Sequence, residues 1–359
     1  MRIRRIVEAV LTSVVCVVAG TSTTFAQSRV TLYGVLDGGI LFTNKTYDHM
    51  SGREGGRAVV ANDGNESPSR IGLSGSEQLG GGVEAIFDLE TGIDISSGKI
   101  ANSNGNFFGR QAWVGIKGGF GNIKVGLQYS PFVIALVQSD PRSGTFFGSG
   151  STLYVGNLYA TGLFNKNAIS YTSPMLYGFQ GSAMLGLGGK AGDFQAGRQY
   201  SASLRYESHG LGVNVAVYKS NPGAQITSPV PDGVPFLGKM VGVSYDFGAA
   251  SAKLLAADYK IDNSFDIRMI GVGGEVRVIP TLYVDAGIWL ARDANRSENS
   301  TLIVGSGLQY FLSKTTQVYV QAGMVKNRGN MHTGMAINGA LYGPTGTTLG
   351  AAIGIRREF

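Results

Sequence analysis

The side chains able to perform acid–base or metal chemistry are few and scattered along this chain. Its three histidines are His49, His209 and His332, and none has the His-x-x-x-His spacing or the flanking glutamate that builds a zinc site. Asp48 precedes His49, but adjacent polar residues in a polar connection are ordinarily solvated, and no Gly-x-Ser-x-Gly turn supplies a nucleophile. The sequence therefore predicts no catalytic residue, no metal site and no enzyme activity.

A glycine-rich segment is the candidate for cofactor binding. Gly186-Leu-Gly-Gly-Lys-Ala191 matches the first, third and sixth places of a loose dinucleotide fingerprint. Such a fingerprint binds a pyrophosphate only where a helix follows it, and no helical pattern follows here. We interpret these glycines as the end of a strand and expect no cofactor.

A further set of polar side chains occurs at alternating positions. Arg70 alternates with the apolar Ile71 and Leu73, and Asp88 and Glu90 likewise alternate with apolar neighbours. Because successive side chains of a β-strand point to opposite faces of the sheet, each segment would have a charged face and an apolar face. The chemistry open to such a charged face is electrostatic, since charges that line an aqueous passage select among ions.

The same alternation fills the chain from Arg29 to Phe359, in stretches of roughly ten residues separated by turns rich in glycine, asparagine and proline. In the first stretch, one face carries Val30, Leu32, Gly34, Leu36, Gly38, Ile40 and Phe42, and the other carries Thr31, Tyr33, Val35, Asp37 and Gly39. The first face suits lipid and the second suits water. A sheet of this kind that continues to the last residue is typical of an outer-membrane β-barrel.

The connections between these stretches alternate in length, as barrel hairpins do when one rim has tight turns and the other has loops. The long connections cover Asn44 to Pro68, Thr91 to Phe107, Ser130 to Asn165, Ser220 to Gly238 and Asn327 to Gly346. Counting the stretches gives about sixteen strands, and a barrel of that size keeps an aqueous lumen. No identity repeats at a period of 20–50 residues, so we expect one domain.

The N-terminus has the features of a secretory signal peptide. Arg2, Arg4 and Arg5 are followed by a mostly apolar run, and Thr24-Phe25-Ala26 offers a small-residue cleavage site. The apolar run is interrupted by a glutamate and is short for the roughly 20 residues of a spanning helix. We therefore expect residues 1–26 to be removed and residues 27–359 to form the barrel.

Composition excludes several other functions. Without residues 1–26, which hold three arginines and one glutamate, 27 basic and 23 acidic residues remain. This small surplus of positive charge gives no reason to expect a nucleic-acid partner. The same cleavage removes the single cysteine, Cys16, so neither a disulfide nor a thiolate metal site would remain.

Several blocks along the chain resemble the general porins of β-proteobacteria, the Neisseria and Burkholderia type. They are Val30-Thr-Leu-Tyr-Gly-Val-Leu-Asp37, Ser69-Arg-Ile-Gly-Leu-Ser-Gly-Ser-Glu-Gln-Leu-Gly-Gly-Gly82, Phe108-Gly-Arg-Gln-Ala-Trp-Val-Gly115, Ile169-Ser-Tyr-Thr-Ser-Pro174 and Gly354-Ile-Arg-Arg-Glu-Phe359. The blocks follow the order of that family over the whole predicted mature chain. The resemblance implies a sixteen-stranded homotrimer, located in the outer membrane with its lipid and lipopolysaccharide, whose third loop folds inward to narrow the pore.

The resemblance also assigns residues to the pore. The connection from Ser130 to Asn165 would be the inward loop, and its only charges are Asp140 and Arg142. Family porins place a ladder of basic residues on the facing wall, and the matching positions are Arg70 and Arg110. Lys124 and Lys166 are further candidates from alternation and from their place beside the loop. If Arg110 faces the lumen, counting along its strand would turn Trp113 toward lipid.

The chain departs from the pattern of that family at two places and matches it at the last residue. Leu127 occupies a place where the family often has a basic residue, and the loop carries little charge. The terminal Phe359 matches the signal by which the barrel-assembly machinery recognises the last strand, with Ile353 and Ile355 on the same face.

These observations predict a passive, water-filled diffusion porin for ions and small hydrophilic solutes. Asp37, Asp88 and Glu90 would add acidic charge to the lumen, but basic groups beside the constriction should count more because distant charges are screened. We therefore expect a weak preference for anions. The alternatives are a solute-specific outer-membrane channel, a barrel enzyme, or a secreted β-sandwich, whose core would have to bury the faces that carry Arg70 and Glu90.

Overall fold

The computed structural model describes residues 28–48, 51, 53–157, 162–223 and 235–359. The barrel wall consists of β1(Ser28–Thr43), β4(Ala58–Asp63), β5(Arg70–Gly80), β6(Val83–Asp94), β7(Lys99–Ile100), β8(Gln111–Gly118), β9(Gly121–Gln128), β10(Asn165–Thr172), β11(Phe179–Gly186), β12(Gln199–Ser208), β13(Leu211–Ser220), β14(Phe236–Asp246), β15(Ala250–Ile261), β16(Asp266–Ile279), β17(Leu282–Asp293), β18(Ser300–Ser313), β19(Thr316–Arg328) and β22(Gly346–Glu358). Two short hairpins, β2(Thr46–Asp48) with β3(Arg53–Gly55) and β20(Thr333–Ala336) with β21(Ala340–Tyr342), lie outside this sheet. The predicted signal peptide and His49 lie outside the described residues.

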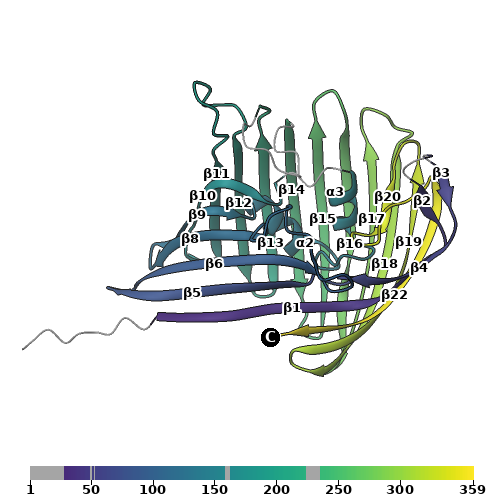
Figure 1. Ribbon diagram of the computed structural model, residues 1–359, viewed down its shortest axis with the longest axis horizontal. Coiled ribbons are helices and arrows are strands. Elements are labelled where there is room, and N and C mark those ends of the chain that lie inside the picture. Colours follow the sequence, from purple (N-terminus) through teal and green to yellow (C-terminus); the bar gives the residue numbers. More distant parts are fainter. Residues whose placement is uncertain (1–27, 49–50, 52, 158–161, 224–234) are drawn as a thin grey trace, which may run out of the picture.

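The sheet is closed and antiparallel (Figure 1). It contains 18 strand segments, but β4 and β5 pair with successive parts of β1, and β7 and β8 pair with successive parts of β6. Each of these two pairs occupies one position in the wall, which leaves sixteen positions. β1 also pairs with β22, with Asp37 opposite Arg356, and so joins the two ends of the chain. The predicted sixteen-stranded barrel is confirmed.

The predicted alternation of faces is confirmed on β1. Val30, Leu32 and Ile40 are 66%, 59% and 52% exposed on the outer face, whereas Asp37 and Leu41 are 0% and 1% exposed. Outward side chains are apolar because the barrel contacts lipid there, and inward side chains are covered by neighbouring elements inside the barrel.

The connection predicted for Asn44 to Pro68 is not a simple loop, because it contains β4. Between β4 and β5 the chain leaves the wall and forms an inward turn, residues 64–69. The Asp37 carboxylate accepts hydrogen bonds from the backbone N–H groups of Glu66 and Ser67, at 2.9 and 2.8 Å, and from the Tyr319 hydroxyl at 2.5 Å. The prediction missed β4 because this segment has only 6 residues and shares one wall position with β5.

The third long connection folds into the barrel, as predicted, and carries α2(Pro131–Ser139) and α3(Gly150–Asn157) (Figure 1). Ser130 caps the N-terminus of α2, because its hydroxyl accepts a hydrogen bond from the Val133 N–H. Phe132 is fully buried, with its ring centroid 6.3 Å from that of Tyr218 and 6.4 Å from that of Tyr259 on the wall. An aromatic cluster therefore holds the start of the loop against the inner face of β13 and β15.

The structure also tests the glycine-rich segment that begins at Gly186. β11 ends at Gly186 and β12 begins at Gln199 with no helix between them, so the interpretation of Gly186 as a strand end is confirmed. None of the helices in the described part of the chain is long and apolar enough to cross a membrane.

Candidate pore constriction

The wall facing the loop carries a compact charged cluster at the start of β5 and just before β8. The Arg110 Nε lies 2.7 Å from one carboxylate oxygen of Glu90, and the Arg70 Nε lies 3.4 Å from the other. The Tyr33 hydroxyl donates to Asp88 at 2.8 Å and lies 3.2 Å from Glu90. Two guanidinium groups therefore share the Glu90 carboxylate, and with Asp88 the two positive and two negative charges of this cluster balance.

Lys124 lies on β9 beside this cluster. Its Nζ is 4.0 Å from the centre of the Trp113 ring, a cation–π contact, and its neighbours Ile123 and Val125 are exposed on the outer face. Trp113 therefore faces the lumen, and the prediction that it faces lipid was wrong. The error arose because Arg110 lies before β8, in a connection where strand alternation does not hold, so parity could not be counted from it.

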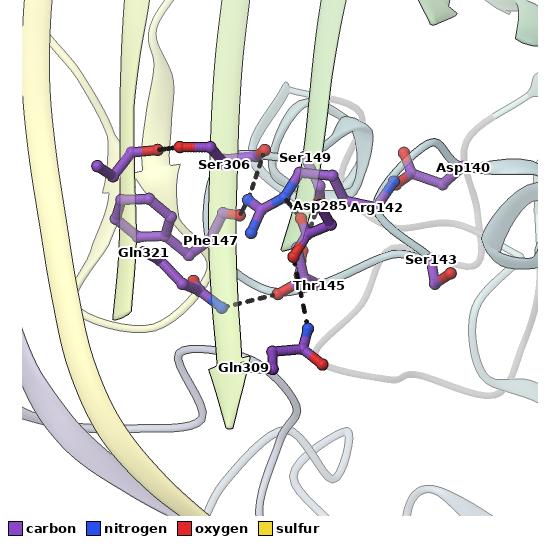
Figure 2. A network of polar contacts seen from close by, with 12 residues as sticks. Asp140, Arg142, Ser143, Thr145, Phe147, Ser149, Asp285, Ser306, Gln309 and Gln321 are labelled. Carbon is purple, nitrogen blue, oxygen red and sulfur yellow. Dashed lines mark hydrogen bonds and ion pairs between the residues drawn. The ribbon is translucent and has the colours of Figure 1, made fainter. Parts of the chain in front are cut away.

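The two charged residues of the loop are buried where the loop meets the opposite wall (Figure 2). Arg142 forms an ion pair with Asp285 of β17. Its Nη1 donates hydrogen bonds to the carbonyl oxygens of Phe147 and Gly148, at 2.6 and 3.1 Å. This arrangement satisfies a charge that would otherwise be costly to bury. Arg142 thus fastens the loop to the wall, and its side chain is 1% exposed.

Asp140 directly follows α2 as its C-cap and organises the turn after it. Its carboxylate accepts hydrogen bonds from the Trp289 Nε1 at 3.0 Å and from the backbone N–H groups of Arg142, Gly144 and Gly150, at 2.9, 3.1 and 3.2 Å. Burial raises the pKa of Asp140, and the three backbone donors oppose that rise. Asp140 therefore joins the loop to β17, as Arg142 does, through buried contacts.

The inward turn also contacts the loop. The backbone carbonyl of Glu66 accepts a hydrogen bond from the Phe146 N–H at 3.1 Å, and its carboxylate accepts one from the Gln317 side chain at 2.6 Å. Burial is the main cause that raises the pKa of Glu66 to about 7, and the charge of Arg356 opposes it. Glu66 is thus an acid that titrates near neutral pH inside the barrel.

A cleft between α2 and the wall from β8 to β13 is the open part of this constriction. Its lining is Gln111, Lys124, Gln128, Tyr129, Pro131, Ile134, Ala135, Gln138, Ser170, Thr172, Gln180, Ser182, Ser203, Arg205 and Asn214. The charged residues among them are Lys124 and Arg205, and no carboxylate belongs to the set. This lining gives a passing anion Lys124 and neutral hydrogen-bond donors, whereas Arg205 forms an ion pair with Glu207.

The structure brings some of the predicted pore residues together and separates others. Arg70, Arg110, Glu90, Asp88 and Lys124 form one wall cluster, whereas Asp140 and Arg142 lie across the lumen in the anchor of the loop.

Two of the remaining predicted residues have other positions. Asp37 holds the inward turn. Lys166 is half-buried at the start of β10, where the pairing with β9 shifts between Asn165 and Ala168.

The terminal residue closes the barrel seam. Phe359 and Gly34 exchange two backbone hydrogen bonds, at 3.0 and 3.1 Å, and Ile353 and Ile355 are exposed on the outer face. A Cβ at Gly34 would lie 2.4 Å from the Phe359 ring and 2.7 Å from the Arg70 carbonyl oxygen, so glycine is required there. Phe359 is half-exposed beside this contact.

Sequence reasoning missed four residues of this constriction. Arg205 was detectable, because it alternates with the outward Leu204 and follows Ser201 and Ser203 on the inner face. Asp285 also alternates with the outward Val284, but nothing local indicates that its partner lies 143 residues away. Glu66 and Arg356 are brought to the lumen by the inward turn and by closure of the barrel.

A closed sixteen-position barrel with a polar lumen and a loop folded into it defines a membrane channel of the porin class. The sequence profile of the Gram-negative porins matches residues 12–330. The chain belongs to this family, and the resemblance to β-proteobacterial porins is confirmed. It is an outer-membrane diffusion channel that crosses the membrane with many strands.

Relatives of this chain include porins of several genera. It is 28% identical to outer membrane porin protein 32 of Delftia acidovorans, over 96% of this chain and 97% of that protein. It is 26% identical to the major outer membrane protein P.IB of Neisseria meningitidis serogroup B, over 84% and 89%. Among solved structures, it is similar to an anion-selective porin from Comamonas acidovorans, with a TM-score of 0.78, 25% identity and coverage of 93% and 100%.

Proposed function

We propose that this porin is a passive general diffusion channel with a weak preference for anions, and that it has no enzyme activity. The observation that carries the preference is the cleft beside α2, whose lining includes Lys124 and Arg205 but no carboxylate. Fixed charge selects ions where a pore is narrow and its charges are poorly screened. The similar Comamonas acidovorans protein is described as an anion-selective porin, which agrees with this reading.

The wall cluster supports the same preference. Arg70 and Arg110 share Glu90, and Lys124 lies beside Asp88, so three basic groups face two acidic groups. The loop adds no net charge to the cleft, because its two charged residues, Asp140 and Arg142, have opposite signs and both are buried. We therefore propose Arg70, Arg110 and Lys124, with Arg205, as the residues that set selectivity.

Single-channel recording in planar bilayers tests this function directly. We expect ohmic steps of current and a reversal potential in a salt gradient on the anion-preferring side. A cation-preferring reversal potential would contradict the proposed preference. Saturation of the current by one solute, at concentrations where related solutes do not saturate it, would instead support a solute-specific channel.

We further propose that the protein is a homotrimer. The outer face of β1 is a continuous apolar surface of Val30, Leu32, Leu36, Ile40 and Phe42, and three identical barrels can bury such a surface in a closed ring. A structurally similar OmpT of Vibrio cholerae is described in a trimer form. Crosslinking in detergent should give a species of three times the monomer mass, and a purely monomeric native protein would refute the proposal.

We also propose that the signal peptide is cleaved and that the last residue is recognised during assembly, from sequence features at the two ends of the chain. Cleavage after Ala26 would leave Gln27 as the first residue, which N-terminal sequencing of the outer-membrane protein would identify.

Recognition of Phe359 by the barrel-assembly machinery is supported by its half-exposed place at the seam. Removal of Phe359 should lower the amount of assembled barrel in the outer membrane without changing synthesis of the chain.

A further inference from the structure

The lumenal face of α2 carries exposed apolar side chains (Figure 1). Ile134 is 46% exposed, and the exposed Val137 and Gln138 follow it by three and four residues, so the three share one face of the helix. The opposite face holds the helix to the wall through the buried Phe132. The inward loop therefore presents apolar surface to the water of the pore, because its two charged residues are buried.

The wall across the cleft is polar but carries little free charge. Its hydroxyl and amide side chains come from two neighbouring rows of the strand register: Thr172, Ser182 and Ser203 in one, Gln180 and Asn214 in the other. Arg205 lies between Gln180 and Asn214 in the second row, but its guanidinium forms an ion pair with Glu207. Hydroxyl and amide groups both donate and accept hydrogen bonds. This wall can therefore orient a polar group without fixing the sign of its charge.

Lys124 supplies the available positive charge of the cleft. Its Nζ lies 4.0 Å from the centre of the Trp113 ring, and among the described residues it forms neither an ion pair nor a side-chain hydrogen bond. The nearby Asp88 carboxylate accepts its hydrogen bond from the Tyr33 hydroxyl. Because an ammonium group has three donors, the contact with the ring leaves Lys124 able to bind an anion.

These three sides make the cleft amphiphilic. Its volume of about 210 Å³ is below the roughly 300–1,000 Å³ of pockets for drug-sized ligands, so it suits a compact solute. A carboxylate bound at Lys124 would leave the rest of such a solute beside Ile134. A second charge there would be desolvated without a partner, whereas an apolar body would remove its own surface and that of Ile134 from water.

We propose that the constriction preferentially binds small monocarboxylates with an apolar body, of which benzoate is a simple aromatic example. This inference rests on the proposed anion-preferring channel and adds the class of solute. The carboxylate accepts hydrogen bonds from Lys124 and from the polar wall, and the ring lies against Ile134. Acetate lacks the apolar body, and succinate brings a second carboxylate to the apolar side, so both bind more weakly.

Block of the chloride current by added benzoate tests this proposal in planar bilayers. At constant potassium chloride, the half-blocking concentration of benzoate should be several times lower than that of acetate or succinate. Ile134→Ser should raise the value for benzoate roughly fivefold and remove most of its difference from acetate, because the apolar contribution follows the area taken out of water. Lys124→Gln should weaken the block by benzoate and by acetate alike.

The matched control is Ile100→Ser, the same substitution at an exposed position of β7 outside the cleft lining. It should keep the benzoate block of the unmodified protein, and the usual shift in gel migration on heating would show that each variant is folded. Equal block by benzoate and acetate, an unchanged block in Ile134→Ser, or an equal loss in Ile100→Ser would overturn this inference while an anion-preferring chloride current remained. A missing or cation-preferring chloride current in the unmodified protein would instead overturn the proposed function.

Discussion

Arg142 of the inward loop and Asp285 of β17 form a buried ion pair across 143 residues of sequence. The pair joins the far side of the loop to the wall, while the aromatic contacts of Phe132 hold its near side. The loop is thus fastened at both sides of the lumen. Its position depends on a few side-chain contacts, which can be removed singly while the backbone pairing of the strands is kept.

Removal of Asp285 should release the loop from β17. In Asp285→Ala the Arg142 charge stays buried without its partner, and breaking a buried pair in this way costs about 3–5 kcal/mol. Because that cost falls on the loop, we expect a folded barrel with frequent, noisy changes of single-channel current. The double variant Arg142→Leu with Asp285→Leu removes both charges and should be quieter than the single variant. A single variant with steady, unaltered current would show that the pair does not hold the loop.

Shortening the loop should widen the pore. If α2 and α3 fill part of the lumen, replacing residues 133–157 with a short glycine–serine linker should raise the conductance. The barrel should still fold, since the deletion removes no residue of the wall. Retained heat-modifiable migration on a gel would report that the barrel still folds. Unchanged conductance in a correctly inserted variant would mean that the loop does not set the resistance of the pore.

The basic residues of the wall should set the ion preference. Neutralising Arg70 or Lys124 with glutamine should shift the reversal potential in a salt gradient toward cations, because each removes one positive charge beside the cleft. Arg110→Gln should act in the same direction but also leave Glu90 with one cation. Lys117→Gln is the matched control, since Lys117 pairs with Glu84 at 3.0 Å near the opposite rim. An equal shift in that control would indicate a general charge effect.

Period-two alternation identified the barrel, the outward face of β1 and the lumenal position of Lys124, because a lipid face and a lumen force that pattern on every strand. It failed at Trp113, where the count of parity started from a residue outside the strand. It could not place Arg142 either, because a loop's composition does not reveal whether its charges are exposed. The partner of Arg142 lies on a strand far along the chain, and only the closed barrel brings the two together.

Glu66 should make the ion preference depend on pH. Burial raises the pKa of Glu66 to about 7 from the ordinary value of 4.5, so the folded protein holds this proton more tightly than the unfolded chain. The stabilisation that the proton brings is complete below about pH 4.5 and is lost as the pH rises through 7. Above pH 7 the ionised carboxylate also adds a negative charge inside the barrel. We therefore expect the anion preference to weaken between pH 5 and pH 8.

The variant Glu66→Gln isolates this effect, because glutamine keeps the shape and a carbonyl acceptor for Gln317 but cannot ionise. Its reversal potential should stay at the low-pH value of the unmodified protein over the whole range, and its barrel should lose less stability toward pH 8. Lysines and arginines remain charged over this interval and do not contribute to the difference. If both proteins change equally with pH, the titrating group is a different residue and Glu66 does not influence the pore.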